Sequence, residues 1–243
     1  MELPRMEEIP ESPNIEEILS APFSYLHEGF QTRAFVSEDG KYVLKTFKTL
    51  DEGKQQFIAW GLDPDRVTQE LVDNSEKSYK LAFHDFRQET ALVYLHLEKS
   101  SPSLIEKVTL DGKEYNTREL QFILQEKVEL VGDRIKKLIG ADDIEGAKRV
   151  IDDVMNFIAR MWERGVTEDT FNWDHNYGYA SSGYIAQIDV GTFWKGEEYL
   201  KKEIEAKKLL DSVSSKWLKE NGPQLVGHYE QKARELYEEY EMK

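Results

Sequence analysis

Short runs rich in apolar, aromatic and β-branched residues, each followed by polar turn residues, first appear between Phe23 and Lys48. The runs are FSYLHEG, RAFVSE and KYVLKTFK. Such runs are typical of strands. The second and third are separated by Asp39-Gly40, a dipeptide that favours a tight hairpin turn. The pattern therefore predicts strands here, the last two joined as a hairpin.

Further along, apolar residues recur every three or four positions, which predicts amphipathic helices. The first is expected within DPDRVTQELVDNSEKSYKLAFHDF. Its shared face carries Val67, Leu71, Ser78, Leu81 and Ala82. A second is expected over RELQFILQEKVELVGDRIKKLIG, which Gly140 would end. A third covers DIEGAKRVIDDVMNFIARMWERG up to Gly165, and two charged helices follow, at about 196–220 and 223–241.

The remaining segments complete an α+β pattern. TALVYLHLE is predicted as a buried strand, KVTLDGKEY contains a second turn signal at Asp111-Gly112, and YGYA-SSG-YIAQI is predicted as a small hairpin. Residues 1–22 are polar and interrupted by prolines. A β-rich first half with one helix precedes a helical second half with one hairpin, which favours α+β organisation over regular βαβ alternation.

Composition narrows the class of protein. The 243 residues are 40% hydrophobic and 12% aromatic, which is typical of a folded globular chain. A net charge of −15 argues against a nonspecific binder of nucleic acid or anionic membrane, although it permits a nucleotide neutralised by magnesium. The absence of cysteine excludes disulfides, zinc–thiolate sites and thiol nucleophiles. No apolar run is long enough to span a bilayer, and the acidic start does not resemble a signal peptide, so a soluble, cytoplasmic protein is the default expectation.

One carboxylate needs an explanation. In GYIAQIDVG, Asp189 follows an apolar strand-like run and precedes Gly191. It either caps the following turn or presents its carboxylate to a metal ion. Asn176 lies on the other side of the predicted hairpin, 13 residues earlier (189 − 176). One carboxylate and one amide oxygen suffice for Mg²⁺ beside phosphate, because Mg²⁺ prefers oxygen ligands and keeps several waters.

The order of these motifs resembles the protein-kinase-like superfamily, particularly its compact atypical branches, the aminoglycoside phosphotransferase-like and lipopolysaccharide-kinase-like enzymes. The resemblance covers about residues 23–194 and rests on GFQTRAF, YVLKTF, Asn176 and Asp189-Val190-Gly191. It implies a bilobal fold that binds ATP and Mg²⁺ between a β-rich lobe and a helical lobe. The implied divisions are a polar extension (1–22), an N-lobe (23–112) and a C-lobe (113–243), with the crossover near Val108–Lys113.

The resemblance also implies residue roles. Lys45 would contact the nucleotide phosphates, and the backbone around Gly29 would approach them. Glu70 would pair with Lys45, since it borders the apolar face of its helix whereas Glu76 faces away. Asn176 and Asp189 would bind magnesium.

The catalytic base departs from the family pattern. The position five residues before Asn176 holds Phe171, and no HRD or HGD motif is present. Asp169 is the residue we assign to orient the acceptor hydroxyl, with Glu168 and Asp174 as alternatives. An equal alternative is that the loop has lost catalysis and its acids cap turns.

Two classes of function therefore remain. The first is an atypical kinase that transfers the ATP γ-phosphoryl group to a hydroxyl of an unidentified protein or small molecule. The second is a pseudokinase-type scaffold that binds a nucleotide or a protein partner without phosphotransfer. The missing HRD, the glycine-poor loop and a C-terminal segment of only about fifty residues after Thr192 favour the second. A third possibility is a helical adaptor unrelated to nucleotides. In that case the order of the motifs from Lys45 to Asp189 would be a coincidence.

Overall fold

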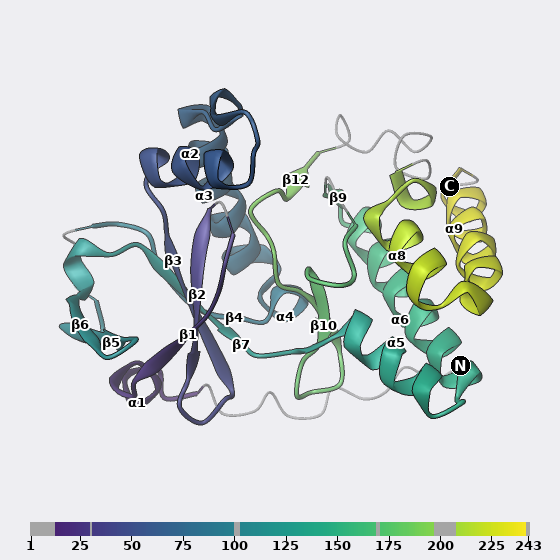
Figure 1. The fold of residues 1–243 in the computed structure, drawn as a ribbon, viewed down its shortest axis with the longest axis horizontal. Helices are drawn as coiled ribbons and strands as arrows, with labels where there is room; N and C mark the ends of the chain where they lie inside the picture. The colour runs from purple at the N-terminus through teal and green to yellow at the C-terminus, as the bar shows by residue number, and fades with distance from the viewer. Residues whose placement is uncertain (1–12, 30, 100–102, 169–170, 197–207, 242–243) are drawn as a thin grey trace. The chain divides into compact units, whose positions relative to one another are not determined.

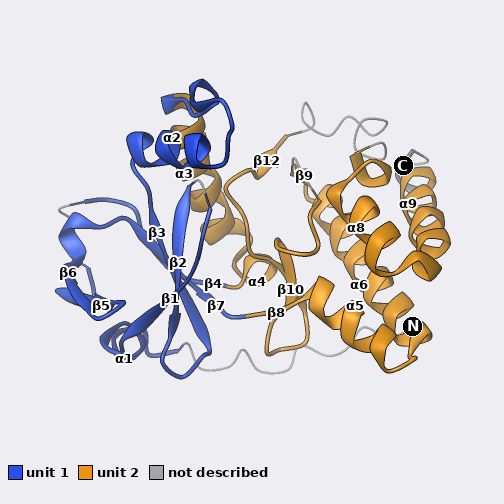
Figure 2. Cartoon of the chain, viewed as in Figure 1, with its two compact units in different colours: residues 1–69, 92–127 blue, residues 70–91, 128–243 orange. Residues whose placement is uncertain are grey.

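The computed structural model describes residues 13–29, 31–99, 103–168, 171–196 and 208–241 (Figure 1). The fold is α+β, as predicted. The chain forms two compact units, and each is made of two segments (Figure 2). Unit 1 contains residues 1–69 and 92–127, and unit 2 contains residues 70–91 and 128–243.

Unit 1 is built on a mixed sheet with the strand order β4-β7-β3-β2-β1-β5-β6. The strands are β1 (Phe23–Glu28), β2 (Thr32–Ser37), β3 (Tyr42–Phe47), β4 (Leu92–His96), β5 (Lys107–Leu110), β6 (Lys113–Asn116) and β7 (Phe122–Glu126). Among the described strands of this sheet only β1 and β5 pair in parallel, at Phe23 and Leu110. The helices of unit 1 are α1 (Ile15–Ser20), α2 (Leu50–Ala59), η1 (Pro64–Arg66) and η2 (Thr117–Glu119).

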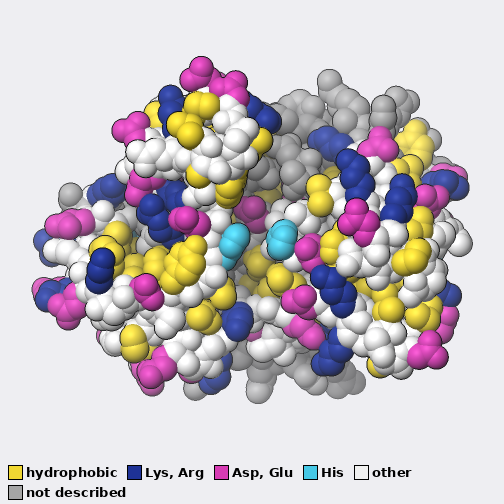
Figure 3. Space-filling view, in the orientation of Figure 1, with side chains coloured by type: hydrophobic (Ala, Val, Ile, Leu, Met, Phe, Trp, Pro, Cys, Tyr) yellow, Lys and Arg dark blue, Asp and Glu magenta, His cyan; other side chains and the backbone are white. Residues whose placement is uncertain are grey.

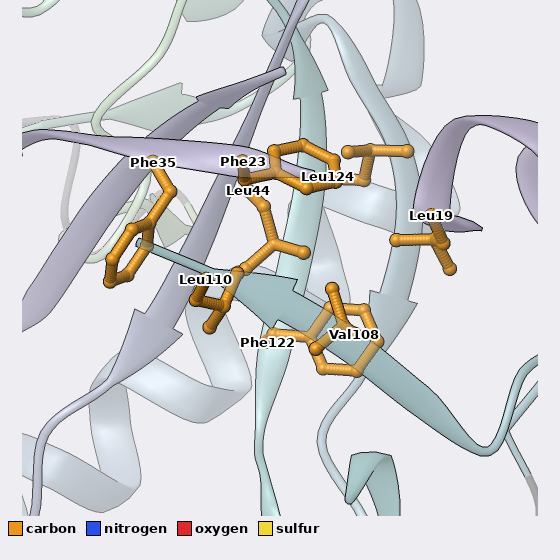
Figure 4. Packing of buried hydrophobic residues seen from close by; sticks show 8 residues of the cluster. All are labelled: Leu19, Phe23, Phe35, Leu44, Val108, Leu110, Phe122 and Leu124. Atoms are coloured by element: carbon orange, nitrogen blue, oxygen red, sulfur yellow. The ribbon is translucent and has the colours of Figure 1, made fainter. Parts of the chain in front are cut away.

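One face of this sheet carries an apolar core (Figure 4). The buried members are Leu19, Phe23, Phe35, Leu44, Val108, Leu110, Phe122 and Leu124. Leu44 of β3 lies opposite Phe35 of β2 and Leu124 of β7, so three neighbouring strands contribute to one face. Because successive side chains of a strand point to opposite faces, Lys45 lies on the face away from this core.

Both Asp-Gly turn signals are confirmed. Gly40 (φ 72°) lies between β2 and β3, and its N–H donates to the Ser37 carbonyl at 2.9 Å. In the β5–β6 hairpin both turn residues are left-handed, with φ 49° at Asp111 and 75° at Gly112. Glycine takes this conformation without a steric cost, which explains why the signal predicts the turn.

The helix predicted over residues 118–140 is wrong in its first half. This segment contains η2, β7, β8 (Glu129–Leu130) and only then α5 (Val131–Gly140). Phe122, Ile123 and Leu124 are fully buried in β7, which pairs with β3 on one side and β4 on the other. Successive buried apolar residues are typical of a central strand, and a short run of them matches a helical face equally well.

The division into units also differs from the predicted lobes. The predicted boundary at 112/113 and the crossover near Val108–Lys113 fall inside the β5–β6 hairpin, and unit 1 continues to Lys127. The helix α3 (Gln69–Asp85) was expected in the N-lobe, yet from Glu70 onward it belongs to unit 2. The helix α2 was not predicted, because among its residues only Gly53 is buried and no apolar face marks it.

Unit 2 is mainly helical. Its elements after α3 are α4 (Arg87–Thr90), β8, α5, α6 (Ile144–Glu163), β9 (Val166–Thr167), β10 (Tyr177–Tyr179), β11 (Ile185–Gln187), β12 (Trp194–Lys195), α8 (Val213–Asn221), η3 (Pro223–Leu225) and α9 (Val226–Glu241). The central helix α6 contacts both α5 and α9. Its predicted apolar face is confirmed from Ala147 to Trp162, and Gly165 (φ 75°) follows its end. The small sheets are β11-β10-β8 and β12-β9.

Charged side chains of both signs are interspersed over the face drawn in Figure 3. None of the helices in the described part of the chain is long and apolar enough to cross a membrane.

A buried histidine in unit 1 leads to a prediction about pH. His96 ends β4, is 5% exposed, and its ring centroid lies 5.2 Å from that of Phe122. Burial lowers its pKa below the ordinary 6.5, while a hydrogen bond with the Thr117 backbone and the charge of Glu98 oppose this shift. The unfolded chain therefore takes up the proton at a higher pH than the folded protein. The contribution of His96 to the free energy of unfolding is therefore fully present well above pH 6.5. It falls as the pH drops below this value, by at most about 1.4 kcal/mol per pH unit.

Urea unfolding at pH 7.5 and pH 5.5 measures this contribution. We expect His96→Gln to lose less stability than the parent between the two pH values. His27→Gln, which removes an exposed imidazole from β1 of the same sheet, controls for the substitution itself. An unchanged pH dependence in His96→Gln would contradict the assignment.

Candidate functional site

The predicted hairpin is confirmed, and its register brings the two candidate metal ligands to one end of it. β10 and β11 pair antiparallel, with Tyr177 opposite Gln187. Asn176 immediately precedes β10, and Asp189 follows β11 by two residues. The Ile188 N–H donates to the Asn176 carbonyl at 2.7 Å, which ties the two flanking segments together. We call residues 171–176 the Asn176 loop and residues 188–193 the Asp189 loop.

The Asp189 loop is anchored by its backbone and leaves its carboxylate exposed. Gln187 Nε2 donates to the Asp189 carbonyl at 3.3 Å. Ser78 Oγ of α3 donates to the Val190 carbonyl and accepts the Phe193 N–H at 2.7 Å. Val190 is 0% exposed, so its apolar side chain also anchors this loop.

Tyr79, a buried tyrosine of α3, interacts electrostatically with the Asp189 carboxylate. Burial raises the pKa of Tyr79 well above its ordinary value, and the negative charge of Asp189 raises it further. The phenol is therefore neutral at physiological pH.

The Asn176 loop has an anchor of the same kind. Ser214, 0% exposed near the start of α8, donates from Oγ to the Phe171 carbonyl at 2.6 Å and accepts the Trp173 N–H at 2.8 Å. Phe171 has φ 41°, a left-handed conformation that is uncommon for a bulky residue. Such a conformation persists only where its surroundings determine it, and here they include the Ser214 hydrogen bonds.

Ion pairs hold α3 and α4 in unit 2. Lys195 Nζ of β12 lies 2.6 Å from Asp85 Oδ2, and Arg164, which follows α6, pairs with Glu89 of α4. The Arg164 guanidinium carbon also lies 4.0 Å from the centroid of the Phe86 ring. These contacts join α3 and α4 to other elements of unit 2.

The predicted Lys45–Glu70 pair joins residues of different units and stays a prediction. Lys45 is half-buried in β3 of unit 1, and Glu70 is exposed in the first turn of α3 in unit 2.

Gly29 is tied to the first residue of β2. The Gly29 N–H donates to the Thr32 carbonyl at 2.9 Å, so this amide is engaged within the turn. The neighbouring Phe30 lies outside the described residues. The predicted approach of this backbone to phosphate stays a prediction, and the Gly29 N–H is not the group that would make it.

Lys48, a buried lysine close to Gly29, was not among the residues predicted from the sequence. The Lys48 side chain is 2% exposed, lies 3.0 Å from Glu28 Oε2 and donates to Gln56 Oε1 of α2 at 2.8 Å. The Lys48 hydrogen bond lowers the pKa of Glu28, against the effect of burial, and Arg33 contributes to the shift. Lys48 directly follows β3 and lies four residues after the buried Leu44. If the alternation of the strand continues for one residue, both side chains point to the face that carries the apolar core, and this could have indicated the burial of Lys48.

The assigned base, Asp169, lies outside the described residues. Glu168 is 2% exposed and lines a cavity of about 10 Å³ together with Trp162, Thr167 and Gln187. A space of this size holds about one water molecule.

Asp174, the other alternative base, lies against Gly132 and Lys136 near the start of α5. A Cβ added to Gly132 would lie 2.6 Å from Asp174 Oδ1. The Asp174 carboxylate also lies 3.7 Å from Lys136 Nζ and 3.4 Å from His175 Nε2. A carboxylate at a helix N-terminus interacts favourably with the helix dipole, which gives Asp174 a structural role.

The two candidate ligands are of the donor types that magnesium takes together with phosphate. Among the described residues no group of three or more His, Asp or Glu side chains forms a cluster that would hold a metal by itself. Asn176 and Asp189 would supply an amide oxygen and a carboxylate, with phosphate and water completing the shell of Mg²⁺.

No protein-family model matches the sequence, and no curated protein matches it significantly.

Proposed function

We propose that this protein is an atypical kinase that binds ATP with Mg²⁺ and transfers the γ-phosphoryl group to a hydroxyl of a protein or small molecule. The observation that carries the proposal is the hairpin register, which brings Asn176 and Asp189 to one end of β10–β11. The backbone hydrogen bonds of both loops support it, because a metal site requires ligands in fixed positions. We extend the proposal to a bilobal kinase-like fold and a cytoplasmic location.

Each residue has a proposed task. Asn176 and Asp189 hold Mg²⁺, which neutralises the phosphate charge when bound. Lys45 binds the phosphates, Glu70 orients Lys45, and Asp169 accepts the proton of the acceptor hydroxyl.

Thermal unfolding tests nucleotide binding directly. Saturating ATP with Mg²⁺ is expected to raise the unfolding midpoint, since a ligand at a hundredfold excess over its dissociation constant stabilises by about 2.7 kcal/mol. Asp189→Ala should abolish the magnesium-dependent part of the shift. Asp211→Ala, which removes another exposed carboxylate of unit 2, should retain it. A parent protein that shows no shift with ATP and Mg²⁺ would refute the proposal.

A scaffold without phosphotransfer is the second candidate, and specific observations favour it. The position where the family pattern places its base holds Phe171, which is 2% exposed, and Glu168 is buried. Asp174 is engaged at α5. A magnesium-dependent shift without hydrolysis of ATP or phosphorylation of any acceptor would identify this scaffold.

A further inference from the structure

We infer that Ser78 and Ser214 are positioning residues of the metal–nucleotide site, an inference that rests on the proposed function. Each serine hydroxyl donates to one backbone carbonyl and accepts one backbone N–H of a loop far from it in sequence. Ser78 acts on the Asp189 loop and Ser214 on the Asn176 loop. We call each arrangement a serine clamp.

The two clamps make the same pair of hydrogen bonds. Ser78 bridges Val190 and Phe193, and Ser214 bridges Phe171 and Trp173. A hydroxyl has one donor hydrogen and two acceptor lone pairs, so one serine can satisfy both a carbonyl and an N–H. All four hydrogen bonds are buried, where leaving either backbone group unpaired is costly.

The clamps act on the same short stretch of structure. Val190 follows Asp189 directly, and Trp173 lies three residues before Asn176, whose N–H donates to the Asn172 carbonyl at 2.8 Å. The Ile188–Asn176 hydrogen bond joins the two loops between the clamps. The clamps therefore fix, from α3 and from α8, the backbone next to both proposed ligands, while Asp189 stays exposed.

Ser75 provides a matched control on the same helix. Ser75 and Ser78 lie one turn apart in α3, and each is 3% exposed. The Ser75 Oγ has no hydrogen-bond partner among the described residues. Ser75→Ala thus removes a buried hydroxyl without releasing a loop, whereas Ser78→Ala releases the Asp189 loop.

The experiment compares Ser78→Ala, Ser75→Ala and the parent, well below their unfolding midpoints. ATP binding is titrated with and without Mg²⁺, and backbone amide exchange is measured at Phe193 and Trp173. We expect Ser78→Ala to need about 10–100-fold more Mg²⁺ for half-maximal ATP binding, the range for loss of a group that orients metal ligands. Its metal-free ATP affinity should be unchanged, and its Phe193 amide should exchange faster.

Other results would separate the possible failures. Equal weakening of ATP binding with and without Mg²⁺ would indicate general damage to the fold and overturn the positioning role. Ser78→Ala behaving like Ser75→Ala, while the parent binds Mg²⁺–ATP, would overturn the inference alone. A parent that does not bind Mg²⁺–ATP overturns the proposed function, and the exchange data then decide only whether the clamps hold the loops.

Ser214→Ala gives an independent version of the test if Ser78→Ala does not fold. It should raise the Mg²⁺ requirement to a similar extent and speed exchange at Trp173 rather than at Phe193. Normal Mg²⁺ dependence in a folded Ser214→Ala protein would overturn the role of that clamp.

Discussion

Trp173→Ala is expected to lower the free energy of unfolding of unit 2 by about 3–5 kcal/mol, the range for deleting a fully buried tryptophan. Trp173 is 0% exposed, and its ring meets that of Tyr229 edge to face with centroids 5.0 Å apart. Its backbone N–H donates to Ser214 Oγ, and its carbonyl accepts the Gly132 N–H at 3.4 Å. The substitution leaves a cavity between the Asn176 loop and α9, and urea unfolding followed by circular dichroism measures its cost.

Two further substitutions show whether packing is the cause. Trp60→Ala removes a tryptophan that is 48% exposed after α2, and we expect a change within about 1 kcal/mol. Trp173→Phe should cost less than Trp173→Ala, because the Trp173 Nε1 has no hydrogen-bond partner among the described residues and its loss leaves no broken bond. Equal costs for Trp173→Ala and Trp60→Ala would contradict the packing of this loop.

Much of the fold was predictable because local chemistry determined it. The Asp-Gly turns require left-handed residues at φ 72° (Gly40) and 75° (Gly112), and this need is visible in the sequence. The helix α6 was predictable because its apolar residues recur along one face of twenty residues. β7 was not, since three consecutive apolar residues do not distinguish a central strand from part of a helix.

The candidate ligands could be paired from the sequence because a hairpin brings its two flanking residues together. The clamps could not be predicted in the same way, since Ser78 bonds to backbone atoms 112 and 115 residues away. The preference of serine for particular secondary structures does not indicate which distant backbone groups its hydroxyl will bind. Ser78 did lie on the predicted apolar face of its helix, however, and a polar side chain on such a face needs a partner.

Gly178→Ala is expected to destabilise unit 2 by about 3 kcal/mol, the upper part of the usual range for overpacking a well-packed site. A Cβ at this position in β10 would lie 2.3 Å from Val128 Cγ2 and 2.8 Å from the Glu129 carbonyl oxygen. Rotation of the valine does not relieve the clash, because Val128 Cβ would also lie 2.8 Å away. The carbonyl belongs to β8, which pairs with β10 at Leu130 and Glu129. The backbone itself must therefore shift, and thermal unfolding measures the cost.

Gly227→Ala provides the matched control, because a Cβ there meets nothing within 4 Å and the residue lies in α9. In a helix this change should stabilise by up to about 1 kcal/mol. β10 pairs with both β8 and β11, so the shift forced by Gly178→Ala also moves Asn176 relative to Asp189. The magnesium-dependent stabilisation by ATP should fall together with stability in Gly178→Ala and stay intact in Gly227→Ala. Loss of stability with undiminished magnesium dependence would show that the hairpin register does not set the metal site.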